Sequence, residues 1–162
     1  VDIDGVSPVS FPASVTAGSY HIAVRHRNHL GIRTPSAQVF STTTVTSYNF
    51  TTAQSQAYQN PSITNNAAMK NLGSGKFGMW GGEASLDGQV FDNNDPDGDV
   101  QWIINTLLGG DPGGSLSNVY SLGDVNMDGL VYDNNDPDGD IQWIINNVLG
   151  SNTGNYIQWH SF

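Results

Sequence analysis

The chain has 162 residues, of which 37% are hydrophobic and only 12% are charged, with 19 glycines and no cysteine. This length fits one compact domain or two small ones. The composition excludes disulfides and thiolate zinc sites, and no apolar run reaches the length of a membrane span. A loop-rich chain without disulfides needs another stabilising element, and a bound metal ion is the obvious one.

Charge is divided unevenly along the chain, whose net charge is −10. The first 76 positions hold all five basic residues and carry a net charge of +3, whereas residues 77–162 contain 13 acids and no lysine or arginine. Carboxylates at this density repel one another and exclude nucleic acid as a partner of the acidic part. This part also holds all four tryptophans, which solvated tails lack. We therefore expect it to fold around cations rather than to be an acidic linker.

The first 80 residues predict strands separated by turns. Residues 19–25 alternate apolar and polar side chains after an Ala-Gly turn, which is typical of a strand. Residues 51–75 are polar and predict a long connection, with a short helix over 67–72. The further predicted strands lie near residues 32, 39–40, 45–50 and 77–80. We expect an α+β fold whose N-terminal part, residues 1–80, is a β-sandwich-like domain.

The chain then repeats itself. Residues 83–109 align with residues 124–150 at an offset of 41 without gaps, and 18 of the 27 aligned pairs are identical. Duplication of an entire unit is a far stronger signal than a short motif. It predicts a duplicated region over residues 81–150, followed by a strand-like C-terminal tail over 151–162.

Each copy opens like an EF-hand-type calcium loop. Residues 124–131 read Asp-Val-Asn-Met-Asp-Gly-Leu-Val, with oxygen side chains at positions 1, 3 and 5, glycine at 6 and a backbone carbonyl at 7. Alternate residues of a curling loop point inward, so three hard oxygens can meet one ion. The first copy is a weaker version of this pattern. The apolar residues at position 8, Val90 and Val131, are expected to pair with each other.

Both copies lack the usual carboxylate at position 12, where Asn94 and Asn135 stand, and further acids follow in an inserted Asp-Asn-Asn-Asp-Pro-Asp-Gly-Asp segment. Each repeat is expected to hold one ion in a long loop, or two ions that share ligands, giving two to four Ca²⁺ in all. Oxygen ligands select Ca²⁺ over zinc or copper, with Mg²⁺ as the second choice. The predicted ligands are Glu83, Ser85, Asp87, Gln89, Asp92, Asn93, Asp95, Asp97 and Asp99 in the first copy, and Asp124, Asn126, Asp128, Leu130, Asp133, Asn134, Asp136, Asp138 and Asp140 in the second.

Each loop is expected to lead into a short helix. Apolar residues between 100 and 108 follow the i, i+3, i+4, i+7 spacing of a helical face, and the second copy repeats this stripe between 141 and 149. Asp97 or Asp99 is expected to cap the first helix, and Gly109 and Gly150 to end the two helices. The two loop–helix units should pack by pseudo-twofold symmetry, each covering the apolar stripe of the other.

Residues 124–150 and their partner copy resemble a dockerin, a pair of calcium-binding loop–helix units from extracellular bacterial proteins, although the insertion between loop and helix is not dockerin-like. A longer part, from about Val1 to Gly150, resembles a module near the C-termini of large secreted bacterial surface proteins. The segments that carry this resemblance are VDIDGVSPV (1–9), GSYHIAVRHRNHLG (18–31), KFGMW (76–80) and GDVNMDG (123–129). It implies a secreted, cell-surface location and no established enzymatic activity. In relatives, β-strand sequence precedes the match to Val1, so an edge strand is expected to be missing here.

Two further features allow several interpretations. The polar run from His26 to His29 fits a metal site, a catalytic pair or a sugar-binding loop, but also a polar hairpin that hydrogen-bonds to backbone. Trp102 and Trp143 fit a sugar-stacking platform or a subunit contact, and equally well packing of the repeats onto the β-rich part. No Gly-x-Ser-x-Gly motif, cysteine nucleophile or phosphate-binding glycine-rich loop is present, so an enzyme is not expected.

We therefore predict a non-catalytic, extracellular, calcium-binding structural or adhesive module. Its other partners are expected to be protein subunits or surface proteins, and strand exchange through the aromatic tail (155–162) would build a fibre. Nucleic acid and membrane insertion are not expected. The alternative is a dockerin-like partner-binding or carbohydrate-binding module, and a calcium-dependent hydrolase comes third.

Overall fold

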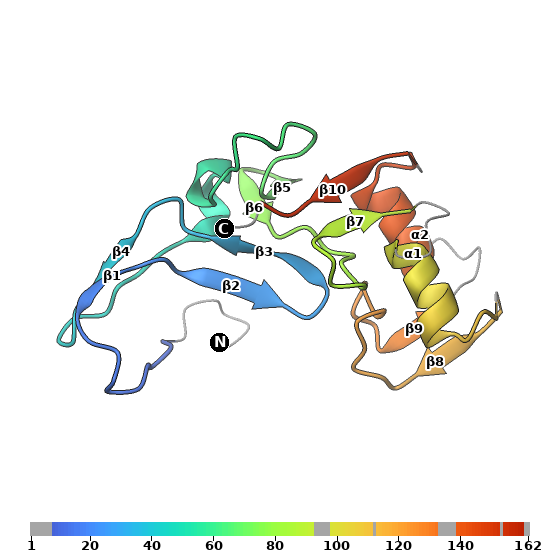
Figure 1. Cartoon of the computed structure of the whole chain (residues 1–162), viewed down its shortest axis with the longest axis horizontal. Coiled ribbons are helices and arrows are strands. Elements are labelled where there is room, and N and C mark those ends of the chain that lie inside the picture. Colours follow the sequence, from blue (N-terminus) through green and yellow to red (C-terminus); the bar gives the residue numbers. More distant parts are fainter. Residues whose placement is uncertain (1–7, 93–97, 112, 133–138, 153, 161–162) are drawn as a thin grey trace.

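The computed structural model describes residues 8–92, 98–111, 113–132, 139–152 and 154–160. Over these residues the chain is a mixed strand-and-helix protein with small two-stranded antiparallel sheets and two short helices. The molecule is elongated, with strands β1 and β4 at one end and helices α1 and α2 at the other (Figure 1). None of the helices in these ranges is long and apolar enough to cross a membrane.

The described residues before 81 form three separate two-stranded sheets. Strand β1 (Gly18–Tyr20) pairs with β4 (Gln38–Phe40), β2 (Ala23–His26) with β3 (His29–Arg33), and β5 (Lys70–Gly73) with β6 (Lys76–Gly78). Two 3₁₀ turns, η1 (Phe50–Thr52) and η2 (Gln54–Gln56), lie between β4 and β5. The β-sandwich predicted for residues 1–80 is not confirmed, because the described strands of this range do not assemble into two larger sheets.

Two local predictions in this region are wrong, and one strand is divided. Residues 67–72 form no helix, because the chain turns back through left-handed residues at Gly73, Ser74 and Gly75 and makes the β5–β6 hairpin. Residues 45–50 form no strand and lead into η1. The strand predicted over 19–25 is divided into β1 and β2, which pair with different strands, and at the break the backbone N–H of Ile22 donates to Thr34 Oγ1 at 3.2 Å.

The duplicated region contains two units of the same order. The first runs through β7 (Gln89–Phe91), α1 (Asp99–Trp102) and its continuation η3 (Ile103–Leu107) to β8 (Ser115–Ser117). The second runs through β9 (Leu130–Tyr132), α2 (Asp140–Trp143) and η4 (Ile144–Val148) to β10 (Tyr156–Gln158). Each helix begins with an α-helical turn and widens into a π-helical one. Each ends at a left-handed glycine with φ +67°, Gly109 or Gly150, as predicted.

The two units exchange their last strands. Strand β7 of the first unit pairs with β10, which follows the helix of the second unit, and β9 of the second unit pairs with β8, which follows the helix of the first (Figure 1). Val90 therefore lies opposite Ile157, and Val131 lies opposite Leu116. The predicted pairing of Val90 with Val131 is wrong. Since Leu116 and Ile157 are also 41 positions apart, the structural repeat extends beyond the segment that the sequence identity marks.

The main hydrophobic core lies within this interlocked pair. It is built from equivalent residues of both units, such as Val90 with Val131 and Ile103 with Ile144, all with 0% exposure. The predicted apolar helix stripes supply much of this core. In contrast, the separate apolar cluster that the described residues before 81 form has four buried members, Ile32, Ala57, Ala68 and Met69, while Leu30 joins the main core. Burial is thus concentrated in the acidic part of the chain.

Candidate metal centre

The first acidic loop, residues 83–91, is wrapped around its own first carboxylate. Glu83 is only 4% exposed, and its Oε1 accepts the backbone N–H of Asp87 at 2.9 Å while its Oε2 accepts that of Gly88 at 2.9 Å. Gly88 has φ +91°, a left-handed conformation that glycine adopts without strain. The carboxylate at position 1 therefore holds the sharp bend at positions 5 and 6, and Gly88 stands where the pattern requires glycine.

The second acidic loop, residues 124–132, treats its first carboxylate differently. Asp124 is 2% exposed, and its Oδ2 forms a 3.1 Å salt bridge with the Arg27 guanidinium from the β2–β3 hairpin. Its Oδ1 is buried and has no hydrogen-bond partner among the described residues. A buried carboxylate oxygen without a partner is costly, and an ion at the site is one of the few arrangements that explains it.

Positions 3 and 5 of the second loop lie on the solvent side. Asp128 Oδ1 accepts the backbone N–H of Leu130 at 2.8 Å, and its Oδ2 accepts a hydrogen bond from the Asn126 side-chain amide at 3.1 Å. Asn126 Oδ1 in turn accepts the backbone N–H of Asp128 at 3.0 Å. These hydrogen bonds link the Asn126 and Asp128 side chains to each other and to the loop backbone, on the side of the loop where Asp128 is exposed.

Asp99 and Asp140 complete the two loops from the helices. Each is 0% exposed and occupies the first position of its helix. Asp99 accepts backbone N–H groups from Ala84 (2.6 Å), Ser85 (3.0 Å) and Phe91 (3.1 Å). Asp140 accepts the equivalent groups of its own loop, those of Val125, Asn126 and Tyr132. Each aspartate is thus the last residue of the inserted segment, and it accepts backbone N–H groups from both ends of its loop.

The capping prediction for Asp99 is therefore wrong. Gly98 is the residue that precedes the first helix, and no side-chain cap hydrogen bond is made there. The Asp99 carboxylate turns back to the loop because three backbone donors, at both ends of the loop, converge on it. Such donors favour the ionised form of the carboxylate.

Crowding of carboxylates is visible in their pKa values. Burial, together with the negative charges of Asp99 and Asp87, raises the pKa of Glu83 to about 8. Burial raises the pKa of Asp99 to about 7 and that of Asp140 to about 6, the latter with a contribution from the charge of Asp124. Burial also raises the pKa of Asp92. Without a cation, the raised pKa values keep Glu83 largely protonated and Asp99 partly protonated near neutral pH.

The predicted ligands divide into three sets. Glu83 lies close enough to Asp99 and Asp87 for their charges to raise its pKa, and the charge of Asp124 raises the pKa of Asp140 in the same way. Ser85, Gln89, Asn126, Asp128 and Leu130 lie along the same loops, and Asp92 follows β7. The predictions for Asn93, Asp95, Asp97, Asp133, Asn134, Asp136 and Asp138 fall outside the described residues. In the part of the chain that is described, no group of three or more His, Asp or Glu side chains is already placed to hold a metal ion.

Sequence reasoning missed Arg27 and Asn28 as parts of this centre. Arg27 pairs with Asp124, and Asn28, with 0% exposure, donates from its side chain to the Asp124 carbonyl at 2.6 Å. This is the polar hairpin interpretation of residues 26–29, with the backbone contacts made across the molecule. The sequence offered only an electrostatic signal. Because no lysine or arginine follows residue 76, any lysine or arginine that pairs with an acid of the repeats must come from the first half of the chain.

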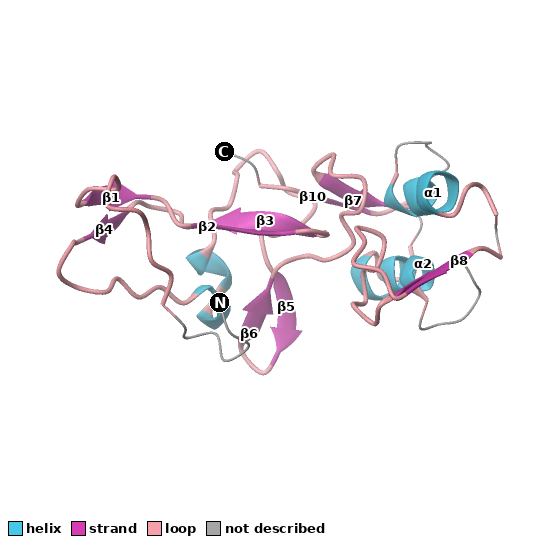
Figure 2. Cartoon of the chain, turned by 90° about the horizontal axis from the view of Figure 1, so that it is seen from below, coloured by secondary structure: helices cyan, strands magenta, loops and turns pink. Residues whose placement is uncertain are grey.

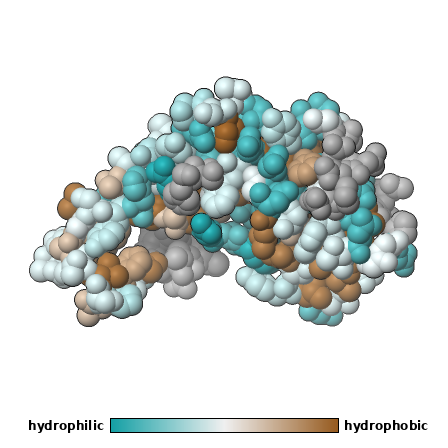
Figure 3. Space-filling view, viewed as in Figure 1, coloured by the Kyte–Doolittle hydropathy of each residue, from teal (hydrophilic) through white to brown (hydrophobic). Residues whose placement is uncertain are grey.

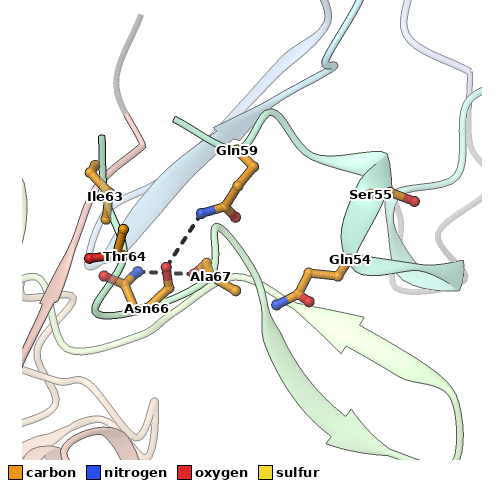
Figure 4. A pocket seen from close by; sticks show the side chains of 7 residues that line it. All are labelled: Gln54, Ser55, Gln59, Ile63, Thr64, Asn66 and Ala67. Atoms are coloured by element: carbon orange, nitrogen blue, oxygen red, sulfur yellow. Dashed lines mark hydrogen bonds between the residues drawn. The ribbon is translucent and has the colours of Figure 1, made fainter. Parts of the chain in front are cut away.

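The features that would favour sugar binding are weak. A cavity of about 490 Å³ is lined by Gln54, Ser55, Gln59, Ile63, Thr64, Asn66 and Ala67, none of them aromatic (Figure 4). Two of its side-chain amides already form hydrogen bonds within the protein, since Gln59 Oε1 accepts the N–H of Ala68 and Asn66 donates to the Gln158 carbonyl. Trp102 and Trp143 are half-buried and pack against the main core. These contacts place both tryptophans against the core of the duplicated region, whereas their packing onto the β-rich part stays a prediction.

Comparison with known proteins adds no relative. No family model matches the chain, and neither a curated protein nor a solved structure matches it. The function is therefore inferred from the geometry and chemistry of the loops.

Proposed function

We propose that this chain is a non-catalytic, calcium-binding structural module in which each acidic loop holds at least one Ca²⁺. The observation that carries the proposal is Asp124. Its carboxylate is buried at the start of an Asp-x-Asn-x-Asp-Gly loop, with one oxygen paired to Arg27 and the other without a partner among the described residues. A cation beside Asp124 Oδ1 would give this buried oxygen the contact that it lacks.

The donor chemistry supports Ca²⁺ over other metals. The ligand positions of the loops provide carboxylate, amide, hydroxyl and backbone carbonyl oxygens, which are the ligands that Ca²⁺ takes in numbers of six to eight. Much of such a set is amide, hydroxyl and carbonyl, so a group of three acids is not required. Asn126, Asp128 and the Leu130 carbonyl belong to the second loop, and the inserted carboxylates add further oxygens.

Charge neutralisation explains why the acidic part contains the main core. Residues 77–162 carry 13 acids and no lysine or arginine, yet they bury the exchanged strands and both helix stripes. Cations that bind only the folded loops would offset the repulsion and add their binding free energy to folding. The proposed pair of loop–helix units is dockerin-like in this respect, with strand exchange between the units as its own feature.

Location and assembly follow from the same proposal. Extracellular calcium modules work with dissociation constants of about 10⁻⁴ to 10⁻³ M, which suits a secreted surface or adhesive protein. Strand donation through the C-terminal tail is disfavoured, because β10 already pairs with β7 and buries Ile157. The end of the molecule that contains β1 and β4 exposes Val39 (73%) and Val45 (83%). Figure 3 shows separate hydrophobic patches on the face of this end that it draws. We place the contact with other subunits at this end.

The test is a calorimetric titration of the metal-free full chain with Ca²⁺ and, separately, with Mg²⁺. The proposal predicts at least two Ca²⁺ per chain and weaker binding of Mg²⁺. Asp87→Ala and Asp128→Ala each remove the carboxylate at position 5 of a loop and should each abolish one site. Both side chains are exposed, so their loss should leave the core intact. The matched control Asp111→Ala changes an exposed acid outside the loops and should leave both sites intact. Absence of binding to the unchanged chain would refute the proposal.

A further inference from the structure

The turn of the β2–β3 hairpin, residues 27–28, contacts the first position of both acidic loops. Figures 1 and 2 both place this end of the hairpin against the duplicated region. The two loops begin at Glu83 and Asp124, which are equivalent positions of the repeat. A direct link between the loops through their strands is not made, because β7 pairs with β10 and β9 pairs with β8.

Asn28 joins the two loop starts through a single buried residue. Its backbone carbonyl accepts the N–H groups of Gly82 (2.9 Å) and Glu83 (3.1 Å), at the start of the first loop. Its side-chain amide donates to the Asp124 carbonyl at 2.6 Å, at the start of the second. Asn28 has 0% exposure, so neither contact has water as an easy substitute.

Arg27 fixes the same junction from the other side of the turn. Its Nε donates to the Ser121 carbonyl at 3.0 Å, and its guanidinium forms the salt bridge with Asp124. The guanidinium also stacks on the Tyr120 ring, 4.0 Å from the ring centre. Three contacts therefore hold Arg27 against the segment that leads into the second loop.

We infer that the hairpin turn is a positioning element that couples the two loops, so that Ca²⁺ binding in one loop raises the affinity of the other. This inference rests on the proposed calcium-binding function. Binding in the first loop orders Glu83, which orders the Asn28 backbone. The Asn28 side chain then holds Asp124 in place, and the second ion binds a loop whose ordering cost is already met. Coupling of this kind is reciprocal between the two sites.

The test measures Ca²⁺ affinity of one loop with the other loop intact or disabled. Asp128→Ala disables the second loop, and it should lower the affinity of the first about tenfold, within the usual range for coupled sites. By reciprocity, Asp87→Ala should lower the affinity of the second loop by the same factor. In chains that also carry Asn28→Ala, either substitution should change the affinity of the remaining loop less than about twofold, because the hydrogen bond to the Asp124 carbonyl is lost.

A matched control separates coupling from general loss of stability. Thr34 also has 0% exposure and follows the far end of the same hairpin, where its side chain accepts the N–H of Ile22. Thr34→Ala should lower the melting temperature and leave the tenfold coupling unchanged. If Asn28→Ala does not fold, Asn28→Ser removes the same amide with a polar side chain and carries the same expectation.

Three results would overturn the inference. One is a tenfold effect that persists in the Asn28 variants, and another is an Asp128→Ala chain whose first loop binds as tightly as before. In both results the unchanged chain still binds Ca²⁺, so the proposed function survives. The third is no Ca²⁺ binding by the unchanged chain, which overturns the proposed function and the coupling together.

Discussion

The two acidic loops occupy equivalent positions of the repeat but stabilise their first carboxylates in different ways. Glu83 bonds to the backbone of its own loop, whereas Asp124 is paired with Arg27 from the N-terminal half of the chain. The longer glutamate side chain reaches the turn at Asp87 and Gly88, while the shorter aspartate leaves one oxygen unpartnered among the described residues. The difference indicates that the first carboxylate is held within its own loop, whereas the second also anchors the β2–β3 hairpin.

The largest expected loss of stability comes from removing the buried aspartate that each loop shares, Asp99 in the first and Asp140 in the second. Asp99→Ala and Asp140→Ala should each lower the free energy of unfolding by about 3 kcal/mol, because each leaves three backbone donors without their carboxylate. Urea denaturation would measure this. Asp111→Ala is the control, since Asp111 is exposed and its carboxylate accepts the N–H of Gly113 in a turn. A cost at Asp99 or Asp140 no greater than at Asp111 would contradict the shared role.

The exchanged strands should respond unequally. Ile157 is 8% exposed and belongs to the main core, so Ile157→Ala should lower the free energy of unfolding by about 2–3 kcal/mol. Leu116, its equivalent in β8, is half-buried, and Leu116→Ala should cost about 1 kcal/mol. Chemical denaturation of both variants gives the comparison directly. Equal or reversed costs would mean that burial does not determine how much each exchanged strand contributes to the free energy of unfolding.

Arg27→Met removes the positive charge that is paired with the first carboxylate of the second loop. Without Ca²⁺ it should lower the free energy of unfolding by about 2 kcal/mol, because it leaves the buried Asp124 carboxylate unpaired. With saturating Ca²⁺ the cost should be smaller, since the ion supplies positive charge to the same group. Thermal melts with and without Ca²⁺ measure the difference. Lys76→Met, which removes an exposed charge, should give the same small change in both conditions.

The smallest expected effect is a pH dependence that Ca²⁺ removes. The pKa of Glu83 is raised to about 8 and that of Asp99 to about 7, so the folded metal-free chain binds more protons than the unfolded chain. Its stability should therefore fall as pH rises from 6.5 to 8, by a few degrees in melting temperature. Ca²⁺ holds the carboxylates ionised and should flatten this slope. A flat slope without Ca²⁺ would contradict the proposed crowding.

His29 gives the opposite sign at lower pH and can be separated from the carboxylates. Burial, with the nearby charges of His26 and Arg27, lowers the pKa of His29 to about 4. The unfolded chain then binds more protons than the folded chain between about pH 6.5 and 4, so stability is lost on acidification. This contribution shrinks as pH rises above 6.5, where His29 becomes mostly neutral in the unfolded chain as well as in the folded one.

Much of the duplicated region could be predicted from the sequence. The helix stripes, the terminal glycines Gly109 and Gly150, and the glycine bend of each loop depend on local spacing, and the structure has all of them. The strand exchange could not be predicted, because Leu116 and Ile157 lie in segments that share almost no identity. Period-2 patterns of three residues are also too short to indicate a partner.

The first 80 residues were harder to predict for a physical reason. Their strands are three to five residues long and exposed in part, so alternation of apolar and polar residues does not define a buried face. The contact of Arg27 and Asn28 with Asp124 joins residues almost 100 positions apart. Local pattern carries no information on such a pairing, and only the charge imbalance between the halves pointed towards it.

A thermal melt of the full chain in millimolar Ca²⁺ and in excess EGTA tests the central claim most directly. A ligand that binds only the folded state stabilises by RT ln(1 + [L]/Kd), and two sites at ten times their Kd would together raise the melting temperature by about 5–10 °C. We expect such a rise with Ca²⁺ and its reversal by EGTA. Identical melting temperatures in the two conditions would contradict the claim that calcium stabilises the acidic loops.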